Sequence, residues 1–392
     1  MNRECVIVDG VRTANARAHA QKGWFRNKRP DELLSAVYSA LFARNTAIKP
    51  EDVEAVFIGT ANQIGMTYDI ARLGWLASGY PDSVPTNTIC QQCPSGMSAI
   101  EHAARAIMCN EGDIFIAGGA EDMFHVPMGY GTDFPPRIIQ YYNPAEISMG
   151  ATAEKVAEMY KVNRKDMEKM AYFSHERARN ARDTGKFDNE IVAVEGEDVD
   201  GNPLMVTRDQ WIRESLSMEE MAGMKSPFKQ DGVVTAALSS PLTVGACGLI
   251  LMSRDRADQL GCEYHLKYNT GVMAGCDPTI MGIGPIPAVK KLLSRTGLSA
   301  EDIDVVELNE AFASQTLVCL KELGLEDEIP FKKTNLWGGG LSLGHPLGES
   351  GARIVITLNN IMKTEKPDAR FGLATLCGGF GNANATLWER VK

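Results

Sequence analysis

Pro50-Glu51-Asp52-Val53-Glu54-Ala55-Val56-Phe57-Ile58-Gly59 aligns with a second stretch of the same chain, Ala300-Glu301-Asp302-Ile303-Asp304-Val305-Val306-Glu307-Leu308-Asn309. Apolar residues recur at helical spacing just before each stretch, around residues 30–45 and 286–297. Each copy is therefore predicted to form an amphipathic helix, an acidic turn and a buried strand. The copies lie 250 residues apart, which is too far for a solenoid repeat and typical of a duplicated domain.

A second similarity supports the duplication. Ser95-Gly96 and Ser350-Gly351 each stand at the start of a segment with an apolar helical face. The region between the copies, residues 121–245, is different: it is richer in Met, Tyr and charge. A helix is predicted there at about 151–184, and a turn at 198–203.

These patterns predict an α/β protein built from two duplicated halves with an inserted loop domain. We expect the first half at residues 1–120, completed by about residues 246–265. The inserted domain would be residues 121–245, and the second half residues 266–392.

Cys93 is the first candidate for chemistry. It lies in Thr88-Ile89-Cys90-Gln91-Gln92-Cys93-Pro94-Ser95-Gly96, and Pro94 has the fixed φ that suits the first position of a helix. We therefore expect Cys93 at the helix N-cap. Unpaired N–H groups and the helix dipole would stabilise its thiolate there, lowering the pKa from about 8.5 toward roughly 7 or below. A thiolate is a strong nucleophile.

Other interpretations of the cysteines remain open. A free cysteine is often a small buried apolar residue, and the chain has nine. We assign that role to the six that lack a distinctive setting: Cys5, Cys109, Cys247, Cys262, Cys276 and Cys319. Cys90 and Cys93 also form a CxxC pair, which is found in redox and metal sites. No second CxxC or suitably spaced histidine pair accompanies it, so no metal site is expected.

Three segments of the second half carry short polar residues, and two of these segments are rich in glycine. They are Asn309–Ala313, Trp337–Gly348 and Cys377–Ala383. Glycine lets backbone N–H groups approach a ligand and point together at a developing oxyanion. These segments contain neither GxGxxG followed by an acid nor GxxxxGK[ST], so a dinucleotide or phosphate loop is disfavoured.

Two side chains stand out in these segments. A buried strand predicted at 371–376 would deliver Cys377 to its turn. His345 lies between Gly344 and Pro346, a rigid setting that favours catalysis over a structural role. The histidines without such a setting are interpreted as structural: His19, His102, His125, His175 and His265.

Composition excludes several classes of protein. The chain has 392 residues, of which 44% are hydrophobic and 23% charged, and its net charge of −10 disfavours a general nucleic-acid binder. No apolar run reaches the length of about 18 residues expected of a membrane span. The N-terminus lacks the pattern of a signal peptide, and the cysteines form no regular framework, so we expect a cytoplasmic protein.

The combined motifs resemble the thiolase family. Asn309-Glu310-Ala311-Phe312-Ala313 and Gly344-His345-Pro346-Leu347-Gly348 are together specific to that family, and the similarity covers essentially the whole chain. His125-Val126-Pro127-Met128 and Gly275-Cys276-Asp277-Pro278 resemble in particular the degradative 3-ketoacyl-CoA thiolases of bacterial fatty-acid oxidation. The resemblance implies a five-layer αβαβα fold and a homodimer or homotetramer.

The resemblance also implies roles for individual residues. Cys93 matches the nucleophile that becomes acylated, His345 the residue that helps to activate it, and Cys377 the thiol that acts as acid and base. Asn309 matches the residue that holds a water in one oxyanion hole, together with His345. The backbone N–H groups of Cys93 and Gly379 would form the second oxyanion hole.

Three further positions match contacts to substrate. Arg213 would lie toward the nucleotide end of coenzyme A, Ser240 toward its pantetheine arm, and Met149 in the wall of the acyl pocket. Coenzyme A would be a co-substrate rather than a permanently bound cofactor, and the inserted domain would bind it.

The implied activity is thiolytic cleavage of 3-ketoacyl-CoA in β-oxidation, through an acyl-Cys93 intermediate. One alternative is a biosynthetic acetyl-CoA acetyltransferase, because the same residues serve the condensation. Another is a redox or metal protein that uses Cys90 and Cys93. A third is a non-catalytic subunit of a β-oxidation assembly, since some family members bind a hydratase/dehydrogenase partner.

Overall fold

The computed structural model describes residues 3–326 and 328–391. Nine strands form the main path of one large sheet, in the spatial order β11-β12-β13-β10-β1-β9-β5-β3-β4. In chain order these strands are β1 (Cys5–Thr13), β3 (Ala55–Gly59), β4 (Thr86–Ile89), β5 (Ile114–Asp122), β9 (Thr243–Ser253), β10 (Leu266–Gly275), β11 (Val305–Leu308), β12 (Phe371–Gly378) and β13 (Asn382–Arg390). Two short strands, β2 (Ala16–Arg17) and β6 (Ile191–Val192), pair with β9 and β1.

The order of pairing is the same in both halves of this sheet. In the first half β1 and β9 are antiparallel, β9 and β5 are antiparallel, and β5 and β3 are parallel. In the second half β10, β13, β12 and β11 repeat these three relationships in the same order. Both copies of the aligned stretch form a 3-10 turn and a strand, η1 (Pro50–Asp52) with β3 and η6 (Ala300–Asp302) with β11. The predicted duplication of these elements is confirmed.

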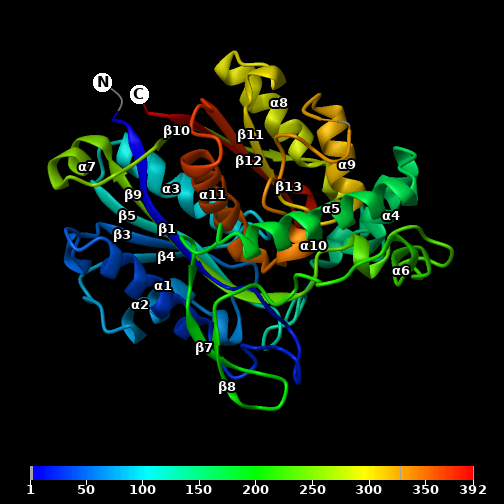
Figure 1. The fold of residues 1–392 in the computed structure, drawn as a ribbon, viewed down its shortest axis with the longest axis horizontal. Coiled ribbons are helices and arrows are strands. Elements are labelled where there is room, and N and C mark those ends of the chain that lie inside the picture. The colour runs from blue at the N-terminus through cyan, green and yellow to red at the C-terminus, as the bar shows by residue number, and fades with distance from the viewer. Residues whose placement is uncertain (1–2, 327, 392) are drawn as a thin grey trace.

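The two halves of this sheet meet where Val6 on β1 pairs with Lys267 on β10. Each half counts as one layer, and the helices outside and between the halves make three more. On the outside of the first half lie α1 (Pro30–Arg44) and α2 (Ile70–Ala77), and on the outside of the second half α8 (Pro285–Thr296) and α9 (Ala313–Glu322) (Figure 1). Between the halves α3 (Ser95–Met108) and α11 (Leu347–Thr364) pack against each other. The αβαβα arrangement implied by the resemblance is therefore confirmed. A short helix, α7 (Arg254–Leu260), joins β9 to β10.

The two central helices approach each other too closely for ordinary side chains at the contact. A Cβ built on Gly96 would lie 2.6 Å from the carbonyl oxygen of Gly348, and one built on Gly351 would lie 2.6 Å from the backbone nitrogen of Met97. These glycines come from the two helix segments that the sequence comparison paired. Their missing side chains allow the N-terminal turns of α3 and α11 to meet.

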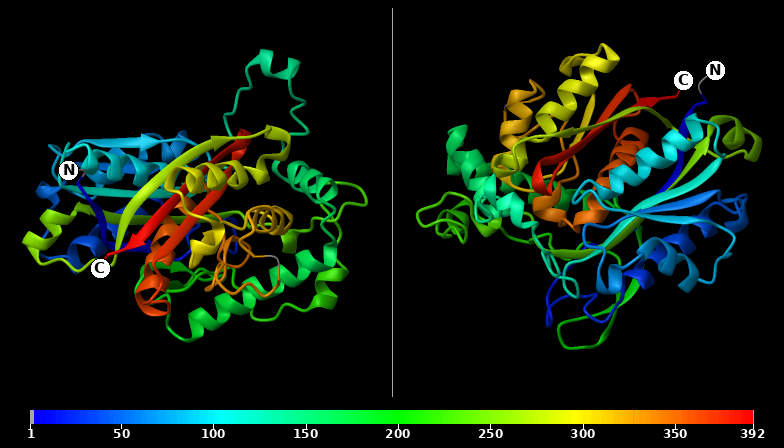
Figure 2. Two further views of the ribbon diagram at one scale, coloured as in Figure 1. Left: turned by 90° about the horizontal axis from the view of Figure 1, so that it is seen from above. Right: turned by 180° about the vertical axis from the view of Figure 1, so that it is seen from behind.

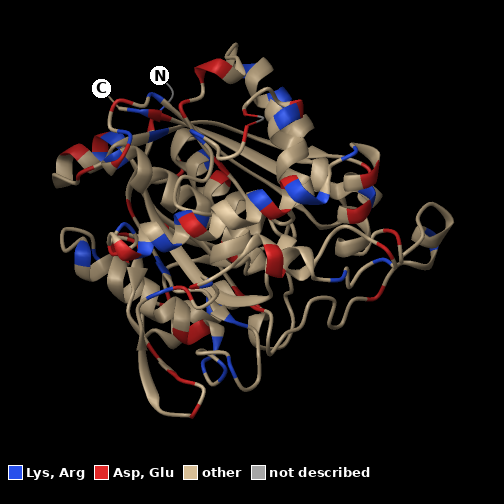
Figure 3. Ribbon diagram, turned by 45° about the vertical axis from the view of Figure 1, so that its right-hand side comes forward, with Lys and Arg blue, Asp and Glu red and all other residues tan. Residues whose placement is uncertain are grey.

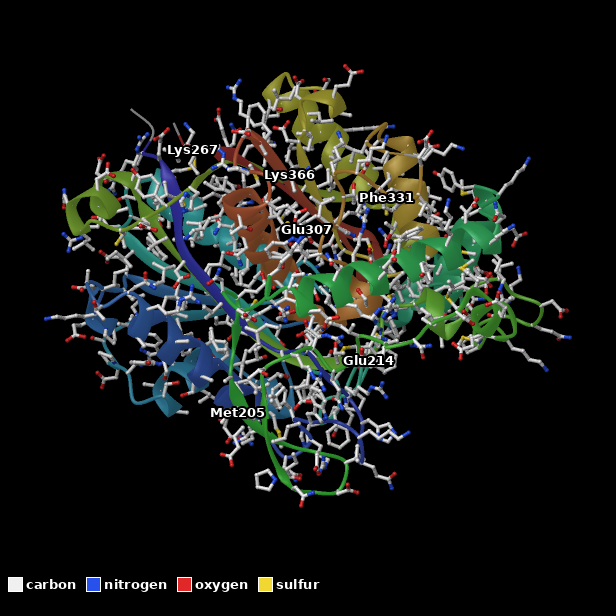
Figure 4. All side chains as sticks on the ribbon, viewed as in Figure 1. Met205, Glu214, Lys267, Glu307, Phe331 and Lys366 are labelled. Carbon is white, nitrogen blue, oxygen red and sulfur yellow. The ribbon has the colours of Figure 1, made fainter. Side chains whose placement is uncertain are left out.

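The segment between β5 and β9 forms the inserted region. Its elements are η3 (Pro136–Gln140), α4 (Met149–Met159), α5 (Arg164–Asp183), β7 (Val194–Glu197), β8 (Pro203–Val206), α6 (Met218–Ala222) and η4 (Ala236–Leu238). The part around η3 extends away from the body of the molecule (Figure 2). The β7–β8 hairpin turns at the predicted position, and Met205 lies on it (Figure 4). The limits proposed for the three domains stay a prediction.

The single helix predicted at about 151–184 is wrong. Two helices occupy this range, because Lys161 has a φ of 53° and interrupts the helical path after α4. Asn163 then caps α5 by accepting a hydrogen bond from the backbone N–H of Asp166. The apolar periodicity continued across the break and concealed it.

A buried ion cluster fastens the inserted region to both halves. Arg12 on β1 donates two hydrogen bonds to Asp209, at 2.7 and 2.9 Å, and one to Glu190 at 2.8 Å. Glu190 also accepts hydrogen bonds from Thr357 and Asn360 on α11. Because these three ions are fully buried, removal of one partner would leave an uncompensated charge.

Charge over the rest of the molecule is mixed. Lys and Arg alternate with Asp and Glu along the ribbon (Figure 3). None of the helices within the described residues combines the length and apolar character needed to cross a bilayer.

We predict that Gly96→Ala lowers the free energy of unfolding by about 2 kcal/mol or more, because the new methyl group would overlap the Gly348 carbonyl. Urea unfolding measures the loss. Gly223→Ala is the matched control, since its Cβ would meet its nearest neighbours at 3.7 Å in right-handed helical backbone. Equal stability of the two variants would contradict the proposed close crossing.

Candidate active site

A cavity of about 540 Å³ lies where the two halves and the inserted region meet. Cys93, His345 and Cys377 all line this cavity. In the sequence, Cys93 lies more than 250 residues before the other two. The apolar part of the wall is contributed by Met123, Met149, Phe228, Met281 and Phe312. Within the described residues, no acidic side chain lines this cavity.

Cys93 lies in the turn between β4 and α3. The structure begins α3 at Ser95, with Pro94 as the N-cap, so Cys93 is one residue outside the predicted N-cap position. Gln92, just before it, has a φ of 59°, which turns the chain sharply into the helix. The thiol is 6% exposed and opens into the cavity.

The expected lowering of the Cys93 pKa is wrong. Burial raises the pKa of this thiol to about 12, because a thiolate loses its hydration there, and the nearby Glu121 carboxylate adds to the rise. The backbone N–H groups of Gly379 and of Cys93 itself act in the opposite direction but are outweighed. Cys93 is therefore a neutral thiol at rest, and its proton must be removed as the nucleophile attacks.

His345 lines the same cavity and is the candidate to receive that proton. It follows Gly344, whose φ of 95° suits only glycine, and it precedes α11 by two residues. Its Nδ1 lies 2.6 Å from the Ser350 hydroxyl, which in turn donates to the Pro346 carbonyl at 2.8 Å. With its one proton used in this way, Ser350 accepts a hydrogen bond from Nδ1–H, which leaves the lone pair on Nε2.

The protonation state of His345 agrees with a role as base. Burial, together with the buried Arg353 guanidinium, lowers its pKa to about 3. The imidazole is therefore neutral throughout the physiological pH range. Neutral His345 and neutral Cys93 form the resting pair.

Asn309 follows β11 directly and is fully buried. Its Nδ2 lies 3.4 Å from each ring nitrogen of His345. Its Oδ1 is buried and has no hydrogen-bond partner within the described part of the chain. An unpaired buried amide oxygen beside the His345 imidazole is a suitable place for an ordered water, which the predicted role would require.

Cys377 lies near the end of β12, on the strand predicted to deliver it. It is 1% exposed and shares the cavity with Cys93. Burial raises the pKa of Cys377 well above its usual range, and charge on Cys93 would raise it further. The two thiols are thus close enough to influence each other. The backbone N–H of Gly379, two residues later, acts to lower the pKa of the Cys93 thiol.

Sequence analysis missed Glu121. Near the end of β5, this buried carboxylate accepts hydrogen bonds from the backbone N–H groups of Ala61 at 2.6 Å and Gly348 at 2.8 Å. It therefore joins the loop after β3 to the first turn of α11, directly behind His345. An acid after the run of small residues Ala117–Ala120 was the available signal, because only a paired carboxylate is tolerated in such a buried strand.

The predicted substrate contacts lie toward the mouth of the cavity. Met149 and Ser240 both line it, and the backbone N–H of Ser240 donates to the Ala311 carbonyl at 2.9 Å, which fixes the loop before β9 against the second half. Arg213 is not among the residues that line the cavity; its guanidinium carbon lies 5.8 Å from the centre of the Trp211 ring, which does line it. His19, interpreted as structural, is at this rim as well.

All nine cysteines are free thiols, and Cys90 is exposed while Cys93 is buried. Among the residues that the structure describes, no three His, Cys, Asp or Glu side chains come together in a way that could hold a metal ion.

Comparisons with known proteins identify the family. The family model described as "Thiolase, N-terminal domain" matches residues 5–255, and "Thiolase, C-terminal domain" matches residues 264–390. The 3-ketoacyl-CoA thiolase of Chromohalobacter salexigens is 45% identical over 392 residues, covering 100% of this chain and 99% of the relative. That of a Marinomonas species is 44% identical over 390 residues, covering 99% of this chain and 98% of the relative.

A solved structure gives the same result. The crystal structure of the Bacillus anthracis acetyl-CoA acetyltransferase matches with a TM-score of 0.88 and 34% identity, covering 100% of both chains. Two family models that together span nearly the whole chain, and full-length relatives well above 30% identity, leave one conclusion: this chain belongs to the thiolase family.

Proposed function

We propose that the chain cleaves 3-ketoacyl-CoA with coenzyme A to give acetyl-CoA and a shortened acyl-CoA. The observation that carries this proposal is the meeting of Cys93, His345 and Cys377 in one apolar cavity. Two thiols and one neutral base are the groups that a carbon–carbon cleavage through a covalent acyl intermediate requires. The full-length relatives named as 3-ketoacyl-CoA thiolases support the same activity.

In the first step Cys93 attacks the 3-keto carbon. Nε2 of His345 takes the thiol proton as the new carbon–sulfur bond forms, so no free thiolate needs to exist in the buried site. The backbone N–H groups of Cys93 and Gly379, which act to lower the pKa of this thiol, would stabilise the oxyanion on the attacked carbonyl.

In the second step the bond between the 2- and 3-carbons breaks. Its electron pair passes to the acetyl-CoA fragment as an enolate, whose oxygen would be stabilised by protonated His345 and by a water on Asn309. Cys377 then gives its proton to the enolate carbon, and acetyl-CoA leaves. Because burial raises the pKa of the Cys377 thiol, the thiol stays protonated until the enolate forms.

In the last steps coenzyme A removes the acyl group. The Cys377 thiolate takes the proton of the incoming thiol, and the CoA sulfur attacks the acyl-Cys93 carbonyl. Cys93 then leaves and recovers its proton from His345, which restores the resting pair. Ser240 on the pantetheine side and Arg213 on the nucleotide side are the proposed CoA contacts, with Met149 beside the acyl chain.

Condensation of two acetyl-CoA molecules is a second candidate function. The similarity to the Bacillus anthracis acetyl-CoA acetyltransferase favours it. The same groups would work in reverse, so only the preferred chain length separates the two. We propose a homodimer or homotetramer as the working assembly, which could also bind a hydratase/dehydrogenase subunit.

We predict that kcat/KM increases with acyl length above acetoacetyl-CoA, by up to about tenfold for two methylene groups, until the cavity is filled. The reason is the apolar wall formed by methionine and phenylalanine side chains. Thiolysis of a series of 3-ketoacyl-CoA esters, followed by substrate loss and by the mass of acylated Cys93, measures this. Equal or lower activity on every longer ester would exclude the degradative assignment.

We predict that the two cysteines separate the two half-reactions. Cys93→Ala should form no acyl-enzyme from any thioester. Cys377→Ala should still be acylated at Cys93 by a simple thioester but lose at least about 100-fold in carbon–carbon cleavage, because the enolate lacks its acid. Intact-protein mass spectrometry and a cleavage assay distinguish them. Undiminished cleavage by Cys377→Ala would refute its role, and Cys319→Ala, another buried thiol, is the control.

We predict that Cys93 remains a thiol as the pH rises through the ordinary range of cysteine titration. Its pKa is raised to about 12, so the thiolate should not appear between about pH 6 and 10. The ultraviolet absorbance of the thiolate, taken as wild type minus Cys93→Ser at each pH, should therefore stay flat. A step in this difference below about pH 9 would show a stabilised thiolate instead, and would restore the expectation from the sequence.

A further inference from the structure

Two guanidinium groups face one indole ring at the mouth of the cavity. The Arg17 guanidinium carbon lies 4.5 Å from the centre of the Trp211 ring, and that of Arg213 lies 5.8 Å from it. Arg17 also lines the cavity, and its Nε is buried with no hydrogen-bond partner among the described residues. Two positive charges thus lie against one ring, and one buried N–H donor has no acceptor. A bound anion would neutralise the charges and accept from this donor.

Hydrogen bonds to the backbone of Arg17 and Arg213, rather than an acidic partner, keep the two arginines close to each other. The Gln210 side chain accepts hydrogen bonds from the N–H groups of Arg17 at 2.9 Å and Trp24 at 3.1 Å. The backbone N–H of Arg213 donates to Nδ1 of His175 at 3.2 Å, and its carbonyl accepts from Arg179 at 2.8 Å. The repulsion between the two cations is thus tolerated by a rigid frame.

Nearby acids are committed elsewhere. Asp209 accepts both of its short ionic contacts from Arg12, and Glu214 is held at 2.6 and 2.9 Å by Arg182. Glu214 lies on the segment that follows Arg213 (Figure 4). Glu220 attracts Arg213, although its carboxylate also accepts the N–H of Ser217 at the start of α6.

Further positive charge lies at the same rim. Lys22 is exposed, lines the cavity and belongs to the loop that Gln210 fastens through the Lys22 carbonyl. A chain with a net charge of −10 therefore presents a cationic mouth in front of an apolar interior, and no acidic side chain among the described residues lines this cavity. Such a mouth attracts an anionic ligand whose uncharged part enters the cavity.

We propose that Arg17, stacked on Trp211 and assisted by Lys22, binds a phosphate of the nucleotide end of coenzyme A and makes the enzyme select CoA thioesters over pantetheine thioesters. This inference rests on the proposed function, since it names a second arginine for the same co-substrate. The Arg17 guanidinium lies over the Trp211 ring, and its buried Nε has no hydrogen-bond partner among the described residues, so this N–H can donate to an oxyanion.

The test compares three variants. Arg17→Met keeps the length of the apolar stem against Trp211 and removes the charge, Arg17→Lys keeps the charge, and Arg370→Met removes an exposed arginine from the far surface as the control. Calorimetry measures the Kd of CoA, dephospho-CoA and pantetheine, and steady-state thiolysis measures KM and kcat with the same three thiols.

We expect Arg17→Met to raise the Kd and KM for CoA by about 10- to 100-fold, the loss of one charge-assisted contact, while kcat changes by less than about threefold. Values for pantetheine should not change, and Arg17→Lys should recover part of the affinity. If dephospho-CoA shows the same loss, the diphosphate is the bound group; if it does not, the 3′-phosphate is. Either result supports the proposal.

Two results would overturn it. The affinity of Arg17→Met for CoA could match that of Arg370→Met, or the variant could lose CoA and pantetheine binding equally, which is the behaviour of a purely structural arginine. Failure of the proposed function has a different signature. The wild-type protein would then bind CoA in the calorimeter yet cleave no 3-ketoacyl ester.

Discussion

Direct backbone contact between the first turns of α3 and α11 is the constraint on which the rest of the site depends. Gly96 and Gly351 leave no side chain between the two helices, so each turn that precedes a helix is brought against the other. Cys93 stands two residues before α3 and His345 two residues before α11, and a proline follows each. The proposed nucleophile and the proposed base therefore each precede the central helix of their own half. The pairing registers relate the strand ends as well: Ala120 near the end of β5 corresponds to Cys377 near the end of β12, and Glu121 corresponds to Gly378.

Burial then determines how these equivalent positions behave. A thiol and an imidazole that exchange a proton in water would divide between neutral and ionic forms, but in this site both charged forms lose their hydration. The neutral pair is therefore the resting state, and charge develops only when a substrate oxyanion meets donors already in place. Glu121 shows the cost of the alternative: its pKa rises to about 7 even though three donors, including Thr60, hydrogen-bond to it. The hydrogen bonds to the buried Glu121 carboxylate hold the loop after β3 and the first turn of α11 in their positions.

The sequence predicted the elements that repeat and the residues with distinctive neighbours. Periodicity located the duplicated strand pairs, and glycine or proline flanks identified Cys93, His345 and Cys377. It failed where the deciding interaction is not local. The pKa of Cys93 depends on total burial by the second half, and the break at Lys161 depends on a single left-handed residue within a continuous apolar pattern. Glu121 was missed for the same reason, because its partners at Ala61 and Gly348 are distant in the chain.

The inserted region fixes the position of the mouth of the cavity relative to the two thiols, which the duplicated halves alone do not do. Asp209 is fixed by Arg12 on β1, and Gln210, the next residue, binds the backbone of Arg17. Trp211 follows at once, so the cationic mouth is anchored to a strand of the first half. On the opposite wall Ser240 is tied to Ala311 of the second half. Neither wall of the cavity can shift without breaking one of these hydrogen bonds to the two halves. A long co-substrate that is held at the mouth would therefore reach both thiols at a fixed distance.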